Sequence, residues 1–70
     1  MSMNSALQKT KRASKDLRVQ WSEVKSVWYD ENSRRFEEQY IVPLLARLRT
    51  VELTMSHMAS ILQKARRDCE

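Results

Sequence analysis

The sequence predicts an all-α protein, folded as an antiparallel two-helix hairpin that pairs with another hairpin into a four-helix bundle. Two long amphipathic patterns are separated by a single polar break at residues 30–33. The chain has no glycine and one proline, and these two residues interrupt helices at a cost of roughly 1 to 3 kcal/mol each. Because Asp, Asn and Ser side chains compete with helical hydrogen bonds and also cap new helices, the break is expected to end one helix and start the next.

The first helix is expected to span residues 5 to about 29, with Asn4 or Ser5 as its N-cap. Apolar and small residues recur there at alternating spacings of three and four, which is typical of a helix with one buried stripe. This stripe consists of Met3, Leu7, Thr10, Ser14, Leu17, Trp21, Val24 and Trp28. Its second half is expected to supply most of the packing energy, because Thr10 and Ser14 bury little apolar surface.

The second helix is expected to begin near residue 32 and to end near residue 67. Phe36 and Tyr40 extend its apolar stripe back to the turn, and Leu45 and Ile61 widen it. Pro43 has no backbone N–H and clashes with the preceding turn, so we expect a continuous helix with a bend near residue 43. The main stripe repeats without a slip through Ile41, Leu44, Leu48, Val51, Met55, Met58, Leu62, Ala65 and Cys69.

The seventy residues (1–70) make a single domain that would be marginally stable alone, because two helices of this length bury little surface. The single cysteine, Cys69, excludes an internal disulfide, and the single histidine, His57, leaves too few ligands for a structural zinc site. We therefore expect a protein partner, in a homodimer or a paralogous heterodimer. The expected core and dimer interface consists of Leu17, Trp21, Val24, Trp28, Phe36, Tyr40, Leu44, Leu48, Val51, Met55, Met58 and Leu62.

No catalytic site, metal or cofactor is expected. The carboxylates fall on the predicted polar faces or in the turn, where neither burial nor crowding would separate their pKa values for acid–base chemistry. Cys69 is expected to make a small apolar contact near the chain end, or alternatively an intermolecular disulfide. No apolar run approaches the ~20 residues of a membrane span. The N-terminus lacks the features of a signal peptide, which predicts a cytoplasmic protein or one secreted by a signal-peptide-independent route.

The formal charge of +4 supports an alternative function as a small basic nucleic-acid-associated protein. Folding the hairpin would bring cations of both helices together into one patch that binds phosphate non-specifically. A third alternative is a structural subunit of a larger helical assembly. The residues of the predicted basic patch are Lys11, Arg12, Lys15, Arg18, Arg47 and Arg49.

The turn resembles that of the WXG family, the small helical-hairpin proteins exported by type VII secretion systems. Trp28 stands at the tryptophan position, Asp30 replaces the glycine, Ser33 is a small residue after the bend, and Phe36 is the aromatic eight positions after the tryptophan. The resemblance covers most of the chain but not the export motif Tyr-x-x-x-Asp/Glu. It implies a non-enzymatic interaction protein that forms antiparallel dimers and is exported by, or associated with, type VII secretion.

Overall fold

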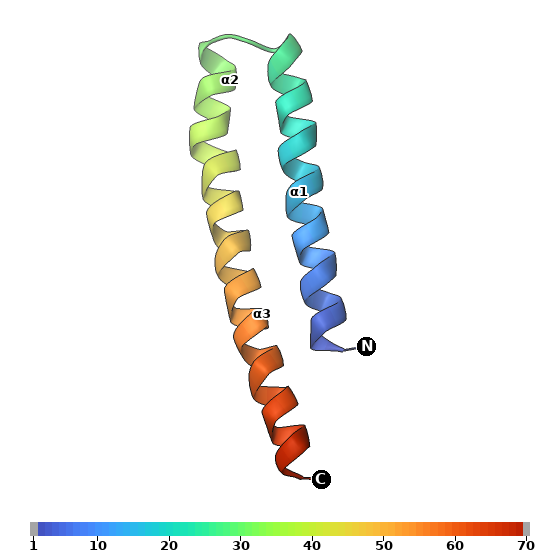
Figure 1. Cartoon of the computed structure of the whole chain (residues 1–70). Coiled ribbons are helices and arrows are strands. Elements are labelled where there is room, and N and C mark those ends of the chain that lie inside the picture. The colour runs from blue at the N-terminus through green and yellow to red at the C-terminus, as the bar shows by residue number, and fades with distance from the viewer. Residues whose placement is uncertain (1, 70) are drawn as a thin grey trace.

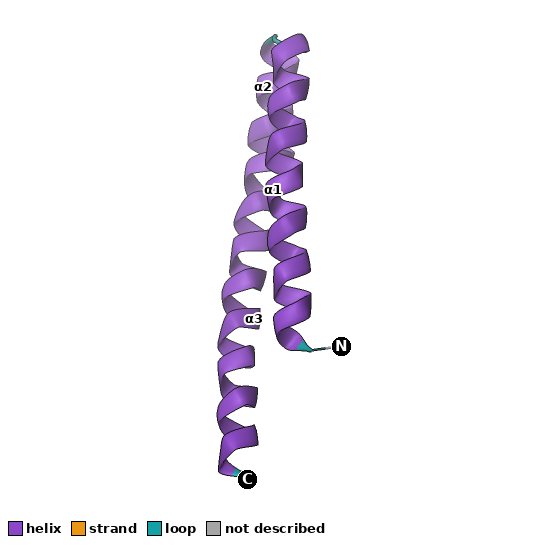
Figure 2. Ribbon diagram, turned by 45° about the vertical axis from the view of Figure 1, so that its right-hand side comes forward, coloured by secondary structure: helices purple, strands orange, loops and turns teal. Residues whose placement is uncertain are grey.

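A computed structural model describes residues 2–69 and shows two antiparallel helical arms joined by one turn (Figure 1). The first arm is α1 (Met3–Val27). The second arm runs through α2 (Glu31–Phe36), a π-helical turn η1 (Glu37–Ile41) and α3 (Val42–Asp68) without a break. Both views place the two ends of the described chain at the same end of the molecule (Figures 1 and 2). The prediction of an all-α helical hairpin is confirmed.

The boundaries of α1 differ from the expected ones. Ser2 is the N-cap, in place of Asn4 or Ser5, because its extended backbone (φ −91°, ψ 160°) lets its hydroxyl accept a hydrogen bond from the Ser5 N–H at 3.1 Å. At the other end Trp28 leaves the helical conformation (φ −116°, ψ 98°), although its N–H still donates to the Val24 carbonyl. The first helix therefore ends at Val27, before Tyr29.

The turn lies earlier than predicted: it comprises residues 28–30, because α1 ends at Val27 and α2 begins at Glu31, inside the expected break at residues 30–33. Asp30 and Ser33 form a capping box: the Asp30 carboxylate accepts from the Ser33 N–H at 3.0 Å, and the Ser33 hydroxyl accepts from the Asp30 N–H at 3.2 Å. Asp30 has an extended backbone (φ −148°, ψ −174°). The bend at this position therefore makes no use of the left-handed conformation for which glycine is favoured.

The helix continues past Pro43 as predicted, and a π-turn lies just before the position of the expected bend. The Val42 N–H bonds to the carbonyl of Glu37, five residues back, and Pro43 lies in the first turn of α3, where proline is tolerated. The buried residues Ser33 and Ile41 are eight positions apart, one more than two α-helical turns. Because a π-turn absorbs one extra residue, both side chains face α1.

The core lies along the line where the two arms meet. On α1 the buried residues are Leu7, Ser14 and Trp21, spaced by seven, and they confirm the predicted stripe. The stripe that the second arm turns toward α1 differs from the predicted one. It contains Leu48 and Met55 as expected, but Leu44, Val51 and Met58 are exposed. The buried or half-buried residues on that side are Ile41, Leu45, Leu48, Glu52, Met55 and Ala59.

A polar pair lies in the middle of this core. Ser14 is only 1 % exposed, and its hydroxyl donates to the Glu52 carboxylate at 2.9 Å. The Thr10 hydroxyl contacts the Met55 sulfur at 3.6 Å one turn away. The expectation that Glu52 lies on a polar face is therefore wrong. A small serine on α1 leaves room for a longer side chain on α3, and their hydrogen bond favours this register of the two arms.

The hairpin is elongated. Its extents are 58 × 17 × 12 Å and its radius of gyration is 16.7 Å, against about 11 Å for a compact domain of this length. The second arm is the longer one, and the last turns of α3 extend beyond the N-terminal end of α1 (Figure 1). These turns have no helix of the same chain beside them.

We expect the Asp30→Ala substitution to destabilise the hairpin by about 1 kcal/mol, because it removes the side-chain acceptor of the capping box. Urea unfolding followed by circular dichroism measures this cost. Asn32→Ala is the matched control, since Asn32 is exposed in the same turn of helix. Equal stability of the two variants would contradict the capping role of Asp30.

Candidate interaction surface

Four aromatic side chains form a cluster where the arms meet near the turn. The rings of Trp28 and Phe36 pack across the turn with centroids 5.9 Å apart, as predicted. Trp21 contacts both of them, at 6.3 Å and 5.4 Å, and Tyr40 extends the cluster from Phe36 at 5.2 Å. Trp21 is buried, whereas 61 % of Tyr40 is exposed. The cluster is therefore buried in the hairpin at Trp21 and exposed to solvent at Tyr40. We call the exposed side its open edge.

One face of the hairpin is hollowed. A groove of about 240 Å³ is lined by residues of both arms, among them Arg18, Ser22 and Lys25 from α1, and Val42 and Leu45 from α3. These side chains define the groove face. The side chains that point away from the groove face on α1 and α3 then lie together on the other face of the hairpin.

The other face is mostly apolar, and we call it the apolar face. Its residues from each arm fall within an arc of about 60° around the helix axis, at 3.6 residues per turn. The open edge of the aromatic cluster lies at its turn end. The apolar face consists of Ala6, Ala13, Leu17 and Val24 from the first arm, and of Phe36, Tyr40, Leu44, Val51, Met58 and Leu62 from the second.

Most of the apolar face on α3 is uncovered. Leu44, Val51, Met58 and Leu62 are 44 %, 41 %, 44 % and 55 % exposed. Among the predicted interface residues, the hairpin itself covers only Leu17, Trp21, Trp28, Leu48 and Met55, which are buried or half-buried. The others, Val24, Phe36, Tyr40, Leu44, Val51, Met58 and Leu62, are exposed. The predicted set therefore divides into a core within the hairpin and an unpartnered surface beside it.

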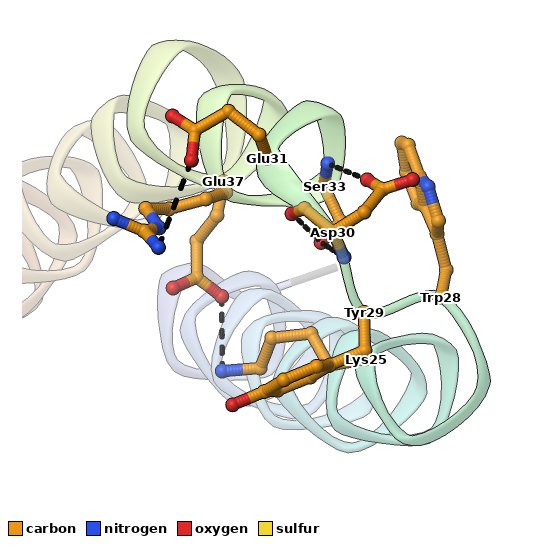
Figure 3. Close-up of a pocket in the computed structure, with 8 residues that line it drawn as sticks. Lys25, Trp28, Tyr29, Asp30, Glu31, Ser33 and Glu37 are labelled. Carbon is orange, nitrogen blue, oxygen red and sulfur yellow. Dashed lines mark hydrogen bonds and ion pairs between the residues drawn. The ribbon is translucent and has the colours of Figure 1, made fainter.

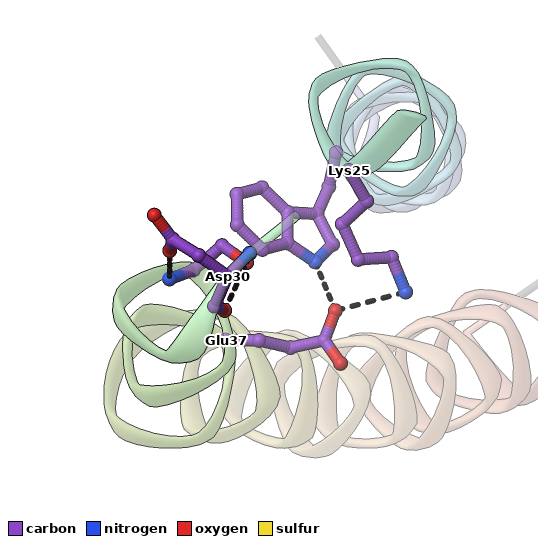
Figure 4. A network of polar contacts seen from close by, with 5 residues as sticks. Lys25, Asp30 and Glu37 are labelled. Atoms are coloured by element: carbon purple, nitrogen blue, oxygen red, sulfur yellow. Dashed lines mark hydrogen bonds and ion pairs between the residues drawn. The ribbon is translucent and has the colours of Figure 1, made fainter. Parts of the chain in front are cut away.

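Glu37 joins the two arms next to the turn. Its carboxylate accepts a hydrogen bond from the Trp21 indole N–H and pairs with the Lys25 ammonium at 2.9 Å. Figure 4 shows Lys25 and Glu37 reaching toward each other from separate helices. The indole hydrogen bond and then the Lys25 partner hold the pKa of Glu37 below its ordinary value of 4.5. The expectation that every carboxylate lies on a polar face or in the turn is wrong for half-buried Glu37.

A hollow of about 330 Å³ lies at the turn, between the end of α1 and the start of α2 (Figure 3). The charged groups that line it already have partners within the hairpin. Lys25 pairs with Glu37, the Glu31 carboxylate lies 3.6 Å from the Arg34 guanidinium, and Asp30 bonds to Ser33. Among the described residues no buried side-chain nitrogen or oxygen lacks a hydrogen-bond partner. The hollow is therefore a feature of the turn itself, and its charged groups are already paired within the hairpin.

The predicted basic patch does not form as one surface. Lys11, Arg12, Lys15 and Arg18 are exposed on α1. Arg47 and Arg49 are also exposed, but two residues apart on a helix they point about 200° away from each other. Only one of them can therefore share a face with the cations of α1.

His57 and the free Cys69 are both exposed. Residues 2–69 contain no cluster of three His, Cys, Asp or Glu side chains that could hold a metal ion. No helix in the same range is both long and apolar enough to cross a membrane.

Comparison with known proteins found no relative: no family model matches the sequence, and no curated protein or solved structure matches it significantly. The contacts of Glu37 and Glu52, and the half-buried position of Ala59 on the side of α3 that faces α1, were not predicted from the sequence. A spacing signal was present, because Leu45, Leu48, Glu52, Met55 and Ala59 recur at three and four just like the predicted stripe. This second stripe was not predicted to be buried because it contains a charged residue, Glu52.

We expect the stability that depends on Glu37 to be lost in acid. Because its pKa is lower in the folded than in the unfolded chain, the folded state binds fewer protons near pH 4.5, so the contribution is complete above that pH and disappears as the pH falls further. Glu37→Gln should therefore lower the urea midpoint at pH 7 and differ less from the wild type at pH 3. Glu38→Gln, at an exposed neighbouring position, is the control. A Glu37→Gln deficit that is the same at both pH values would contradict this account.

Proposed function

We propose that this chain is a non-enzymatic protein-interaction module, one half of a four-helix bundle whose other half is a second helical hairpin. The observation that supports the proposal is the uncovered apolar face. A row of aliphatic and thioether side chains runs along α3 through Leu44, Val51, Met58 and Leu62, all more than 40 % exposed. A helix that carries apolar residues over more than one stripe is typical of a helix with more than one neighbour.

The exposed area of the chain also supports a partner. The hairpin exposes 5994 Å², whereas a compact monomer of 8.3 kDa exposes about 4,600 Å². The excess is about 1,400 Å² per chain, and a standard protein interface buries about 800 Å² on each partner. Burying a standard interface would therefore remove more than half of this excess.

A second hairpin fits this face better than a globular partner with a pocket. The face is long and narrow, since the molecule is 58 Å long and 17 Å wide. Side chains spaced by three, four and seven on parallel or antiparallel helices interlock as knobs into holes. Two layers of two helices would bury the open edge of the aromatic cluster and leave both groove faces in solvent.

The resemblance to the WXG family extends the proposal to type VII secretion. The contact between Trp28 and Phe36 across the turn supports this relation, since the family resemblance rests on these two positions. The proposed role is that of an exported or secretion-associated binding protein. Co-expression with a type VII secretion system tests it: accumulation of the chain in the medium, dependent on the secretion ATPase, is the expected result. Retention in cells, with or without the ATPase, would contradict it.

We expect the thermal midpoint of the pure protein to rise with protein concentration, because association stabilises the folded chain by mass action. A hundredfold increase in the concentration of a saturating partner is worth about 2.7 kcal/mol. Circular dichroism melts across two decades of concentration provide the measurement. A cooperative melt whose midpoint is independent of concentration would contradict self-association.

We expect Met58→Glu to abolish association and Leu53→Glu to preserve it. Both side chains are exposed in the single hairpin, at 44 % and 59 %, so neither change costs much in an isolated chain. In the bundle a glutamate at position 58 would be buried among apolar side chains without a partner. Light scattering of both variants measures the mass, and an equal effect of the two substitutions would contradict the assignment of the apolar face.

A further inference from the structure

We propose that the hairpin has a second interaction surface, a group of cations on the groove face that binds the phosphate backbone of a nucleic acid duplex. We call this group the cationic cluster. The inference goes beyond the proposed function, because the groove face and the apolar face lie on opposite sides of the hairpin. A helical partner on the apolar face would leave the cluster in solvent. The cationic cluster consists of Lys11, Lys15 and Arg18 from α1 and Arg49 from α3.

The positive charge of the chain is concentrated in the middle of the hairpin. Seven of the thirteen lysines and arginines, but only two of the nine acidic residues, lie in residues 9–18 and 47–52. The hydrogen bond between Ser14 and Glu52 shows that these two segments lie side by side. Seven cations less two carboxylates give this part of the hairpin a charge of +5, against +4 for the whole chain.

Three cations lie on the groove face of α1. Lys11, Lys15 and Arg18 are spaced by four and three, so at 3.6 residues per turn they fall within an arc of about 60°. The same spacing continues through Ser22 and Lys25, which line the groove together with Arg18. All three cations are exposed. They therefore form a row along the first arm.

Arg49 joins this row from the second arm. It is exposed and follows Leu45, which lines the groove, by four residues, so it lies on the same side of α3. The arms are antiparallel, and Ser14 pairs with Glu52. Arg49 lies three residues before Glu52 and is therefore about level with the residue three positions after Ser14. This places it close to the level of Arg18.

The cations of the cluster make no ion pair within the described part of the chain. Among residues 2–69 the ion pairs involve Lys25 and Arg34, and neither belongs to the cluster. Glu52 lies beside the cluster, but it is half-buried and accepts a hydrogen bond from Ser14. The four charges therefore point into solvent without a carboxylate of the same chain to neutralise them.

A duplex matches the density of this charge better than an acidic protein segment. The cluster extends about 10 Å from Lys11 to Arg18, at 1.5 Å per residue. A duplex presents one negative charge per about 1.7 Å, or about six over this length. An extended peptide has only about three residues in the same length. Such a peptide would have to be acidic at every position and would still supply fewer charges.

The position and composition of the cluster also favour a duplex over a lipid surface or a single strand. A helix that binds at a membrane interface carries its cations beside the apolar stripe that inserts, whereas here the two lie on opposite faces. Proteins that bind single strands stack the bases on aromatic side chains, and the cluster contains none. The fitting partner is a duplex contacted through its phosphates, without recognition of the base sequence.

Fluorescence anisotropy of a short labelled DNA duplex, measured across a salt series, tests the proposal. Four phosphate contacts predict a slope of about −3.6 for the logarithm of the binding constant against the logarithm of the salt concentration. The affinity should then fall on the order of a hundredfold between about 50 and 200 mM salt. Lys15→Gln combined with Arg49→Gln removes two contacts, which should halve the slope and reduce the fall to about tenfold.

Lys9→Gln combined with Arg47→Gln is the matched control. Both residues are exposed, and each precedes a member of the cluster by two positions, so it points about 200° away from that member. This control removes the same charge from the same part of the hairpin and should keep the wild-type slope. Circular dichroism should show equal helix content in both double variants. Equal slopes for the two double variants would overturn the assignment to the groove face.

The wild-type protein tests the choice of partner. Failure to bind the duplex at about 10⁻⁴ M protein in 50 mM salt would overturn the proposal, because non-specific binding reaches this strength even at physiological salt. Binding to phosphatidylserine vesicles or to polyglutamate as tight as binding to the duplex would also overturn it, in favour of a lipid or a protein partner. None of these results bears on association through the apolar face, which light scattering without nucleic acid measures separately.

Discussion

The structure depends on a mismatch between its two arms. The second arm carries two adjacent apolar stripes, one through Ile41, Leu48 and Met55 and one through Leu44 and Val51, whereas α1 is a single helix and can cover only one of them. The covered stripe makes the hairpin, and the uncovered stripe remains in solvent. Hydrophobic burial is the main favourable term in folding, so a chain with so much uncovered apolar surface is only marginally stable by itself. This constraint is the physical basis for the proposed interaction function.

Two local features determine which stripe faces inward. The capping box of Asp30 and Ser33 starts the second arm immediately after the turn. The π-turn then adds one residue before Ile41, which rotates the rest of α3 relative to α2. Glu37 lies in this turn, where it bonds to the Trp21 indole and to Lys25 on α1. The π-turn therefore helps to set which stripe of α3 faces α1 and which stays exposed.

Much of the fold could be predicted from the sequence, because the polar break and the spacing of α1 leave few alternatives. Leu7, Ser14 and Trp21 face inward as their spacing requires. The stripe of the second arm was predicted less well, since Leu44 and Leu45, or Val51 and Glu52, satisfy nearly the same spacing. Apolar periodicity favoured the residues that the hairpin leaves exposed. Only the contacts across the core, such as Ser14 with Glu52, distinguish the two stripes, and such contacts cannot be derived from one helix at a time.

Sedimentation equilibrium of the wild-type chain at neutral pH tests the central claim most directly, because it measures mass without labels or substitutions. The hairpin has a mass of 8.3 kDa. If the uncovered stripe of α3 is an interface between two copies, the measured mass approaches twice this value as the protein concentration rises. A mass that stays at that of one chain at every concentration, for a protein whose helices are fully formed, would contradict the account.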